Sequence, residues 1–299
     1  MDGQSWLTER FEQNRPRLRG VAYRMLGSLS EAEDAVQEAW LRLNRTNTAT
    51  VDNLDGWLTT VVSRVCLDIL RSRKSRREEP MGAHFAEPSV GRGQGADPEG
   101  EAMLADSVGV ALLVVLDTLT PPERLAFVLH DLFAMPFDEI GSIVGRSPAA
   151  AKQLASRARR RVRGSPARSA EGRVRQCELV EAFLRAVRTG DLEGLLTVLD
   201  PDAVIRIDGA TRIAGGAADA ADTPREIRGA SAWSKQLLAF SQGLRFVQMA
   251  LINGAVGLIL APRGKLSRVV IFTFANDKVT RLEVIGDPVR LGELDIAVL

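Results

Sequence analysis

Cysteine, histidine and tyrosine are scarce in this 299-residue chain, and it has no long apolar run. The two cysteines, Cys66 and Cys177, lie in different segments and form no CxxC pair. We therefore expect neither a disulfide framework nor a zinc site, and a reducing cytoplasm is the expected location. The longest apolar run, Val108–Leu116, is too short to span a bilayer. The N-terminal residues also lack the apolar core of a signal peptide, so we expect no membrane contact. We further expect no metal and no cofactor.

Charge is balanced overall, at a formal +1, but it is strongly segregated along the chain. Between Arg146 and Arg175 there are ten basic residues and one acid, and between Arg64 and Arg77 six and one. The stretch Glu31–Glu38 instead holds four acids and no base. Basic clusters indicate contact with a polyanion, and the acidic cluster indicates a basic protein partner. A solvated helix face is the alternative for any single cluster, but two basic helices on separate segments favour nucleic acid.

The segment Pro136–Arg163 predicts a short helix, a tight turn at Gly145 and a second helix. Ser147 is a good N-cap, and Pro148 suits the first helical position. The second helix has an apolar seam of Ala151, Leu154, Ala158 and Val162, opposite Lys152, Gln153, Ser156, Arg157, Arg160 and Arg161. Small apolar residues on one face and long donors on the other are typical of a helix-turn-helix that enters the major groove.

Residues 1–75 predict helices with polar connections. An apolar stripe contains Phe11, Leu18, Val21, Ala22 and Met25, and Ser30 with Glu33 predicts a capping box at the next helix. A polar loop over Asn44–Asp55 precedes a long helix from about Gly56 to Lys74. Residues 76–101 are rich in glycine, proline and charge, which is typical of a linker.

The chain changes character after residue 172. Two helices, Val174–Arg188 and Asp191–Leu199, are followed by strand-like runs at Ala203–Ile207, Leu244–Ile252, Ala255–Ala261, Ser267–Ala275 and Lys278–Ile285, with a helix near Ser231–Ser241. Asn276-Asp277 predicts a hairpin turn. Helices followed by antiparallel strands favour an α+β sheet curled around a helix layer.

Three motifs in order resemble those of bacterial RNA polymerase sigma factors. Asp34-Ala35-Val36-Gln37-Glu38 resembles their core-binding motif, and Asp55-Gly56-Trp57-Leu58, running on to Arg71, resembles the helix that melts and reads the −10 element. Pro136–Arg163 resembles their −35-reading helix-turn-helix. The order and the intervening linker match the minimal extracytoplasmic-function class (group 4). The tail resembles a SnoaL-like domain of the NTF2 fold in its element order.

The resemblance implies a multidomain fold. An all-α σ2 domain (1–75) and a linker (76–104) precede a helix-turn-helix σ4 domain (105–163), and a second linker (164–172) leads to an α+β, cone-shaped SnoaL-like domain (173–299). The tail departs from related subgroups. Where some of these subgroups carry Asp-Gly-Gly-Gly-Lys, this chain has Asp208-Gly209-Ala210-Thr211-Arg212. The linker also departs, because His84-Phe85-Ala86-Glu87-Pro88 stands where some subgroups carry Trp-Leu-Pro-Glu-Pro.

The implied partners are promoter DNA and the polymerase core, through the β′ coiled coil and the β flap. Asp34, Gln37 and Glu38 share one helix face and would engage the core. Candidate contacts to the −10 strand are Asn44, Arg45, Asn47, Asn53, Arg64, Arg71 and Lys74. Candidate −35 contacts are Arg146, Ser147, Lys152, Gln153, Ser156, Arg157, Arg160 and Arg161. Trp57 either stacks on a base or belongs to the core.

The role of the tail is open at the level of sequence. NTF2-type enzymes use an Asp or His base and often a Tyr donor, but His84, His130 and Tyr23 all lie outside the tail. Asp202 and Asp208 remain, so we expect no catalysis. Regulation from within the chain is the first hypothesis, and a small-molecule ligand is the second. For the whole protein, the alternatives to a sigma factor are a DNA-binding regulator that never engages polymerase and a bifunctional protein.

Overall fold

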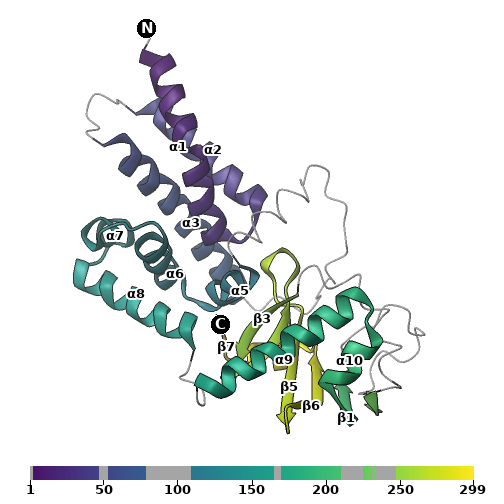
Figure 1. Ribbon diagram of the computed structural model, residues 1–299. Coiled ribbons are helices and arrows are strands. Elements are labelled where there is room, and N and C mark those ends of the chain that lie inside the picture. Colours follow the sequence, from purple (N-terminus) through teal and green to yellow (C-terminus); the bar gives the residue numbers. More distant parts are fainter. Residues whose placement is uncertain are drawn as a thin grey trace. The chain divides into compact units, whose positions relative to one another are not determined.

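The computed structural model describes residues 3–46, 53–78, 109–164, 170–209, 225–230, 232 and 247–299. The chain forms two compact units, which are described separately below. Unit 1 contains Met1–Val108 and Leu116–Arg159, and unit 2 contains Gly109–Val115 and Arg160–Leu299. Helices α5 (Val110–Thr118) and α8 (Pro148–Arg163) therefore contribute residues to both units. Figure 1 labels both helices.

Unit 1 is helical throughout its described residues. Its elements are α1 (Gly3–Leu26), α2 (Leu29–Arg45), α3 (Leu54–Glu78), the end of α5, α6 (Pro121–Phe127), the π-helix η2 (Val128–Leu132), α7 (Phe137–Val144) and most of α8. Helices α1, α2 and α3 pack on one another as a bundle (Figure 1). The predicted stripe on α1 is confirmed, because Phe11, Leu18, Val21, Ala22 and Met25 are all buried.

The start of α2 differs from the prediction. Ser28, not Ser30, is the N-cap residue, with extended backbone and a side chain that accepts from the Glu31 N–H. Glu33 makes no capping box. It pairs instead with Arg19 of α1, at 3.2 Å between Oε1 and the guanidinium. The Glu33 carboxylate, which the sequence predicted as part of the cap, therefore binds Arg19 of another helix instead.

Helix α3 is buried on two faces rather than one. Leu58, Val62 and Val65 are buried as predicted, while Val61 and Ile69 are only half-buried. A second row, Thr59, Ser63, Cys66, Leu67 and Leu70, is also buried, and α3 contacts α6 and α7. Burial raises the pKa of the Cys66 thiol to about 12, so this cysteine is a core residue that stays protonated at neutral pH.

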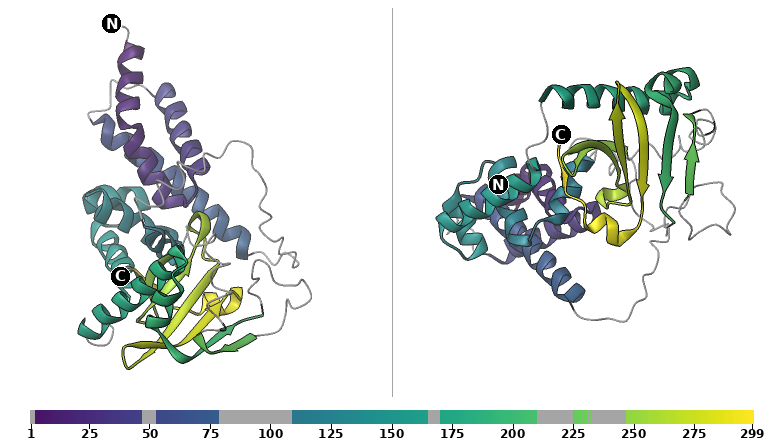
Figure 2. Two further views of the ribbon diagram at one scale, coloured as in Figure 1. Left: turned by 45° about the vertical axis from the view of Figure 1, so that its right-hand side comes forward. Right: turned by 90° about the horizontal axis from the view of Figure 1, so that it is seen from below.

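The described residues of unit 2 form a seven-stranded sheet in the order β2-β1-β6-β5-β4-β3-β7. The elements of unit 2 are α9 (Ala170–Thr189), α10 (Leu192–Val198), β1 (Leu199–Ile207), β2 (Arg225–Arg228), β3 (Val247–Ile252), β4 (Ala255–Leu260), η5 (Pro262–Gly264), β5 (Arg268–Ala275), β6 (Lys278–Ile285), α12 (Pro288–Gly292) and β7 (Ile296–Ala297). Helix α9 runs along one face of this sheet (Figure 2). Phe183 of α9 meets Phe272 of β5 edge-on, with ring centroids 5.3 Å apart, inside the core between the helices and the sheet.

The predicted α+β tail is confirmed, with one correction to the strand directions. Strands β1 and β6 are parallel, whereas the other pairs are antiparallel. Asn276 and Asp277 form the β5–β6 turn with positive φ, as predicted. The short elements β2, α12 and β7 were not predicted, since two to five residues carry too little periodicity. Most of the helix expected near Ser231–Ser241 lies outside the described residues.

One buried arginine joins the two halves of unit 1. Arg124 of α6 is 3% exposed, and burial lowers the pKa of its guanidinium. Its Nε donates to the Arg24 carbonyl at the end of α1 (3.0 Å), and a terminal nitrogen donates to Asp117 (3.2 Å). From α3, Arg73 similarly donates to the Leu26 carbonyl (3.2 Å) and pairs with Glu31. Two carbonyls that the last turn of α1 cannot satisfy are thus bound by side chains from elsewhere.

Replacing Arg124 with methionine should destabilise the protein. The change preserves most of the side-chain volume but removes the charge-assisted hydrogen bonds, so we expect a loss of roughly 1.5–3 kcal/mol in the free energy of unfolding of unit 1. Urea denaturation followed by circular dichroism measures it. Arg157→Met, at an exposed position on α8, is the matched control and should change stability by less than about 0.5 kcal/mol. Equal midpoints for the two variants would contradict this role of Arg124.

Candidate polymerase and promoter interface

The turn between α7 and α8 is held by close backbone approach. Gly145 is left-handed (φ 75°), and both its N–H and that of Arg146 donate to the Gly141 carbonyl. A Cβ on Gly141 would lie 2.7 Å from the Arg146 carbonyl oxygen, so only glycine allows this turn. Ser147 then caps α8 by accepting from the Ala150 N–H (3.2 Å), and Pro148 begins the helix, as predicted.

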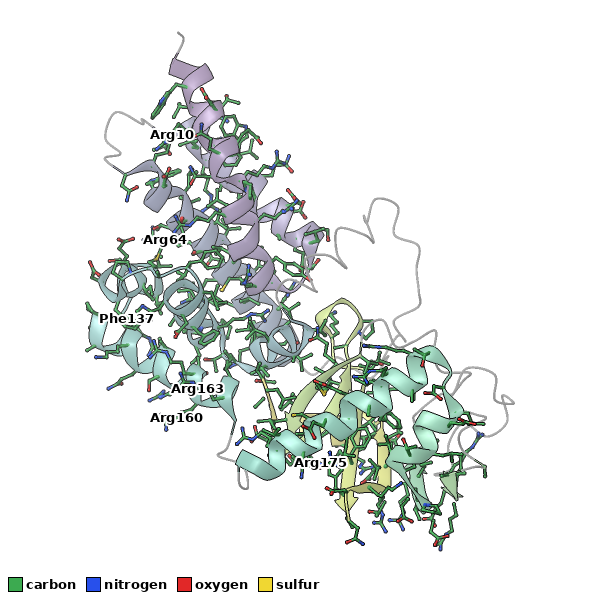
Figure 3. The ribbon with its side chains drawn as sticks, viewed as in Figure 1. Arg10, Arg64, Phe137, Arg160, Arg163 and Arg175 are labelled. Carbon is green, nitrogen blue, oxygen red and sulfur yellow. The ribbon has the colours of Figure 1, made fainter. Side chains whose placement is uncertain are left out.

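Helix α8 separates an apolar face from a cationic face. Ala151, Leu154 and Ala158 of the predicted seam are buried, together with Ala155, while Val162 is half-buried. All of the predicted −35 residues are exposed: Arg146 and Ser147 just before the helix, and Lys152, Gln153, Ser156, Arg157, Arg160 and Arg161 on it. Figure 3 labels Arg160 and Arg163 near the C-terminal end of the helix. Side chains near the start of such a helix reach base edges, and arginines near its end bind phosphates.

The acids of α2 divide into two groups. Glu31 and Glu33 point back into the bundle, where they pair with Arg73 of α3 and Arg19 of α1. Asp34 and Gln37 are exposed, and Glu38 is partly exposed and paired with Arg42 at 2.8 Å. The three predicted core-binding residues therefore share an outward face.

Leu41 extends that acidic face and was not predicted. It is 44% exposed and lies seven residues after Asp34, two helical turns along the same side of α2. A single exposed leucine is common on protein surfaces, so it is the position of Leu41 on this face, and not its exposure, that makes it a candidate contact. The signal that could have found it was the i, i+3, i+4, i+7 spacing of Asp34, Gln37, Glu38 and Leu41.

The candidate −10 residues lie at the two ends of one connection and along α3. Asn44 and Arg45 are exposed at the end of α2, and Asn47 lies outside the described residues. Asn53 also has a local task, because its Oδ1 accepts from the Gly56 N–H (3.0 Å) at the start of α3. Arg64, Arg71 and Lys74 are exposed along α3, spaced for a common face (Figure 3 labels Arg64). Trp57 is half-buried, which leaves both of its readings open.

Of the two predicted tail carboxylates, Asp208 makes structural contacts. Asp208 is 9% exposed at the end of β1, and its Oδ2 accepts from the N–H groups of Gly286 (2.8 Å) and Asp287 (2.9 Å). Asp208 thereby fixes the connection from β6 to α12. Asp202 is exposed, and its N–H donates to Asp200. Among the described residues, no group of histidine, cysteine, aspartate and glutamate is arranged to hold a metal ion.

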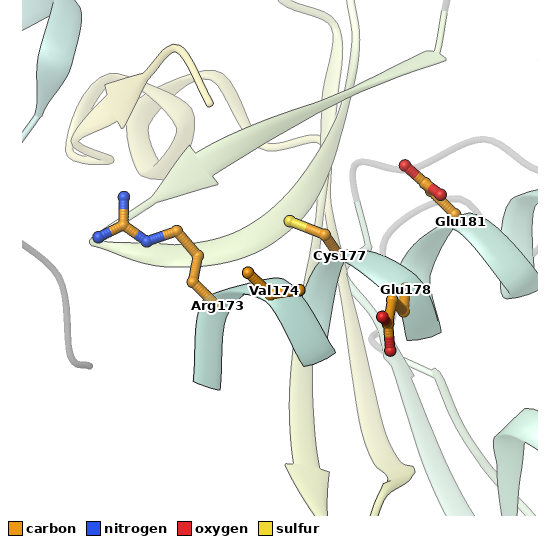
Figure 4. A pocket seen from close by; sticks show the side chains of 5 residues that line it. All are labelled: Arg173, Val174, Cys177, Glu178 and Glu181. Carbon is orange, nitrogen blue, oxygen red and sulfur yellow. The ribbon is translucent and has the colours of Figure 1, made fainter. Parts of the chain in front are cut away.

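An open pocket lies along α9 of unit 2. It is lined by Arg173, Val174, Cys177, Glu178 and Glu181 (Figure 4). Cys177 and Glu181 point to one side of the helix and Glu178 to the other (Figure 4). Burial raises the pKa of the Cys177 thiol, which disfavours its nucleophilic form. Nothing in this lining identifies a ligand, so the small-molecule hypothesis stays a prediction.

Comparisons with known proteins bear on the class that these features indicate. The chain matches the Sigma-70 region 2 family over residues 10–76 and the Sigma-70, region 4 family over residues 109–162. It is 39% identical over 291 residues to the ECF RNA polymerase sigma factor SigJ of Mycobacterium tuberculosis, covering 93% of this chain and 91% of the relative. The crystal structure of SigJ matches with 33% identity and a TM-score of 0.44, covering 95% and 98% of the two chains.

A second relative from Mycobacterium tuberculosis is the probable ECF RNA polymerase sigma factor SigI, 34% identical over 277 residues, which cover 92% of this chain and 91% of that one. The chain belongs to the ECF RNA polymerase sigma factors, the extracytoplasmic-function class of DNA-binding transcription initiation factors. It directs RNA polymerase core to promoters. No described helix is long and apolar enough to cross a membrane. The expected class and its two sigma regions are therefore confirmed.

Substitutions on α8 should separate base readout from phosphate contact. Lys152→Ala and Gln153→Ala should each cost roughly 1–3 kcal/mol on a −35 duplex and relax its sequence preference. Arg160→Ala should weaken binding to all duplexes alike and lower the salt slope by about 1. Fluorescence anisotropy on specific and random duplexes at several salt concentrations measures both effects. Arg185→Ala, an exposed arginine on α9, is the control. Equal losses on both duplexes for every α8 variant would make the helix a phosphate clamp only.

Proposed function

We propose that α2 docks this sigma factor on the polymerase core and that α3 and α8 read the −10 and −35 elements. The exposed face of α2 would engage the β′ coiled coil, and the helix-turn-helix would lie near the β flap. Asn44, Arg45, Asn47, Asn53, Arg64, Arg71 and Lys74 would hold the −10 strand. The protein would act in the cytoplasm and carry out no bond chemistry, because the polymerase contains the active site.

One observation carries the DNA part of this proposal. Every residue chosen for −35 contact is exposed, while the opposite face of α8 is closed by small apolar side chains. This division would allow α8 to approach a groove closely with its cationic face toward phosphates and bases. The position of α8 directly after the Gly141–Gly145 turn is that of a recognition helix.

We propose that the packing of α7 on α3 within unit 1 belongs to a closed state. The −10 and −35 elements are named for their positions, which differ by about 25 base pairs. This separation corresponds to roughly 85 Å along B-DNA. Helix α7 contacts α3, and α8 has only 16 residues, a length of roughly 24 Å. One rigid unit 1 therefore cannot reach both elements. We propose that α6 and α7 separate from α3 when the polymerase core binds.

Charge reversal on α2 tests core docking. Asp34→Arg combined with Glu38→Arg should abolish binding to core polymerase, because the exposed carboxylates become cations opposite a basic partner. Leu41→Ala should weaken binding without changing charge. Glu193→Arg with Glu293→Arg, both exposed on unit 2, makes the same change in net charge and should leave affinity unchanged. Gel filtration with core enzyme measures all three, and wild-type affinity in the α2 double variant would refute the assignment.

The tail is proposed to modulate activity from within the chain. Nine residues at most separate Arg163 from the predicted tail domain at residue 173, so the link spans at most ~30 Å. Such a short link keeps the tail at high effective concentration near the σ4 segment. The tail thus modulates σ4 without needing a strong contact of its own.

Ending the chain after Gly164 should change run-off transcription several-fold in one direction, while the tail added in trans should act only weakly, because it lacks the tether. Circular dichroism of the shortened chain checks that its helices persist. Wild-type transcription from a well-folded shortened chain would show that the tail is not a regulator. A ligand-binding role would then become the better interpretation.

A further inference from the structure

The segment that matches the Sigma-70, region 4 family, here called the region 4 segment, begins and ends inside unit 2. The family match covers residues 109–162, and unit 2 takes Gly109–Val115 and everything from Arg160 onward. The first and last helices of this segment thus have their outer ends among the strands of the tail. Each end carries backbone groups that the helix itself cannot satisfy.

The N-terminal end of α5 is capped by a side chain of β3. The Ala111 N–H belongs to the first turn, where no intrahelical acceptor exists, and it donates to Gln248 Oε1 at 3.1 Å. Val110, Ala111, Leu113 and Val114 are buried around this hydrogen bond. Gly264 of η5 approaches so closely that a Cβ there would lie 3.3 Å from Leu113 Cβ. The start of α5 is therefore built into unit 2.

The C-terminal end of α8 is capped by the end of the chain. The Val162 carbonyl, in the last turn, accepts from the Val298 N–H at 2.9 Å. Gly164 follows with φ 67°, and a Cβ on it would lie 2.5 Å from Ala297 Cβ. The chain end therefore reaches α8 only because residue 164 has no side chain.

One strand holds both caps. Gln248 is near the start of β3, while Leu251 and Ile252 near its end pair with Ala297 and Ile296 of β7. Asn253 locks the connection that leads into β7, since its N–H donates to the Asp295 carbonyl (2.7 Å) and its Oδ1 accepts from the Asp295 N–H (2.9 Å). Strand β3 thus places the Val298 N–H and the Gln248 amide on the two helix ends.

The last turn of α8 carries the cations that would bind phosphates. Arg160, Arg161 and Arg163 all lie within the four residues before Gly164, and Val162, whose carbonyl is capped, lies among them. Figure 3 labels Arg160 and Arg163. A frayed last turn would let these arginines move independently and lose their common direction. The capped turn holds their backbone in helical geometry.

We propose that Val298 is a positioning residue for promoter binding, while Gln248 caps the other end of the segment. By capping α8, the edge of the tail sheet holds the last-turn arginines in register for the DNA backbone. This inference rests on the proposed −35 reading by α8. It assigns the tail a defined contribution to that reading.

Val298→Pro in the full chain removes the donating N–H, and Val298→Ala is the control that keeps it. Ala297 is already in a strand, so the extended backbone that a following proline favours is present. We expect Val298→Pro to accelerate amide hydrogen exchange in the last turn of α8 several-fold. The slope of log K against log salt for a −35 duplex should fall by about 1 for each phosphate that the variant no longer neutralises. Val298→Ala should match the unaltered chain in both measurements.

Two further comparisons separate capping from general destabilisation. Gln248→Met should accelerate exchange in the first turn of α5, whereas Gln248→Glu keeps an acceptor at a helix N-terminus and should not. Gly164→Ala should behave like Val298→Pro, and adding Ala297→Gly should restore part of the protection by removing the clashing methyl group. A loss of overall stability would explain neither the normal exchange of Gln248→Glu nor the protection that Ala297→Gly restores.

Exchange in α8 that is equal for Val298→Pro and Val298→Ala would overturn the cap. Faster exchange with an unchanged salt slope would overturn the positioning role. Failure of the proposed function looks different, since the unaltered chain would then bind −35 and random duplexes equally. The exchange measurements need no DNA and would still decide whether the caps exist.

Discussion

The backbone groups at helix ends need hydrogen-bond partners, and much of this structure follows from how the chain supplies them. Each α-helix leaves N–H groups at its start and carbonyls at its end without intrahelical partners. Some are capped locally, as Ser147 caps α8 and Asn53 caps α3. Others are capped from a distance, as Arg124 and Arg73 cap the end of α1. The distant caps connect segments that are far apart in sequence.

Arg124 shows what a distant cap achieves. Its guanidinium is buried among apolar residues, which is unfavourable unless the charge is hydrogen-bonded. The Arg24 carbonyl and the Asp117 carboxylate meet that need, and in doing so they join the region 2 bundle to the first helices after the linker. Helix α3, which contacts α6 and α7, is buried on its second face, where Ser63 and Cys66 lie.

The surface proposed for function on α2 consists of side chains that are not used in contacts between helices. On α2, Glu31 and Glu33 pair with arginines of neighbouring helices, so the outward charge falls to Asp34 and Glu38, with Leu41 beside them. In the tail, Asp208 accepts from the N–H groups of Gly286 and Asp287, which argues for a structural rather than a catalytic carboxylate. The contribution that we propose for the tail in promoter binding comes from its sheet edge, where β3 and β7 cap the ends of α5 and α8.

Local pattern determined most of the helices, though not α12, together with the turn at Gly145, the cap at Ser147, both faces of α8 and the β5–β6 hairpin. Each of these depends on side-chain periodicity or on backbone preferences within a few residues, which a single sequence displays. The start of α2 was mispredicted because Glu33 found a tertiary partner, and the parallel β1–β6 pair was missed because strand direction is set by chain connections. The caps on α1, α5 and α8 were decided only by the tertiary structure. Their donors and acceptors lie 47 to 137 residues apart, and no local periodicity encodes such a pairing.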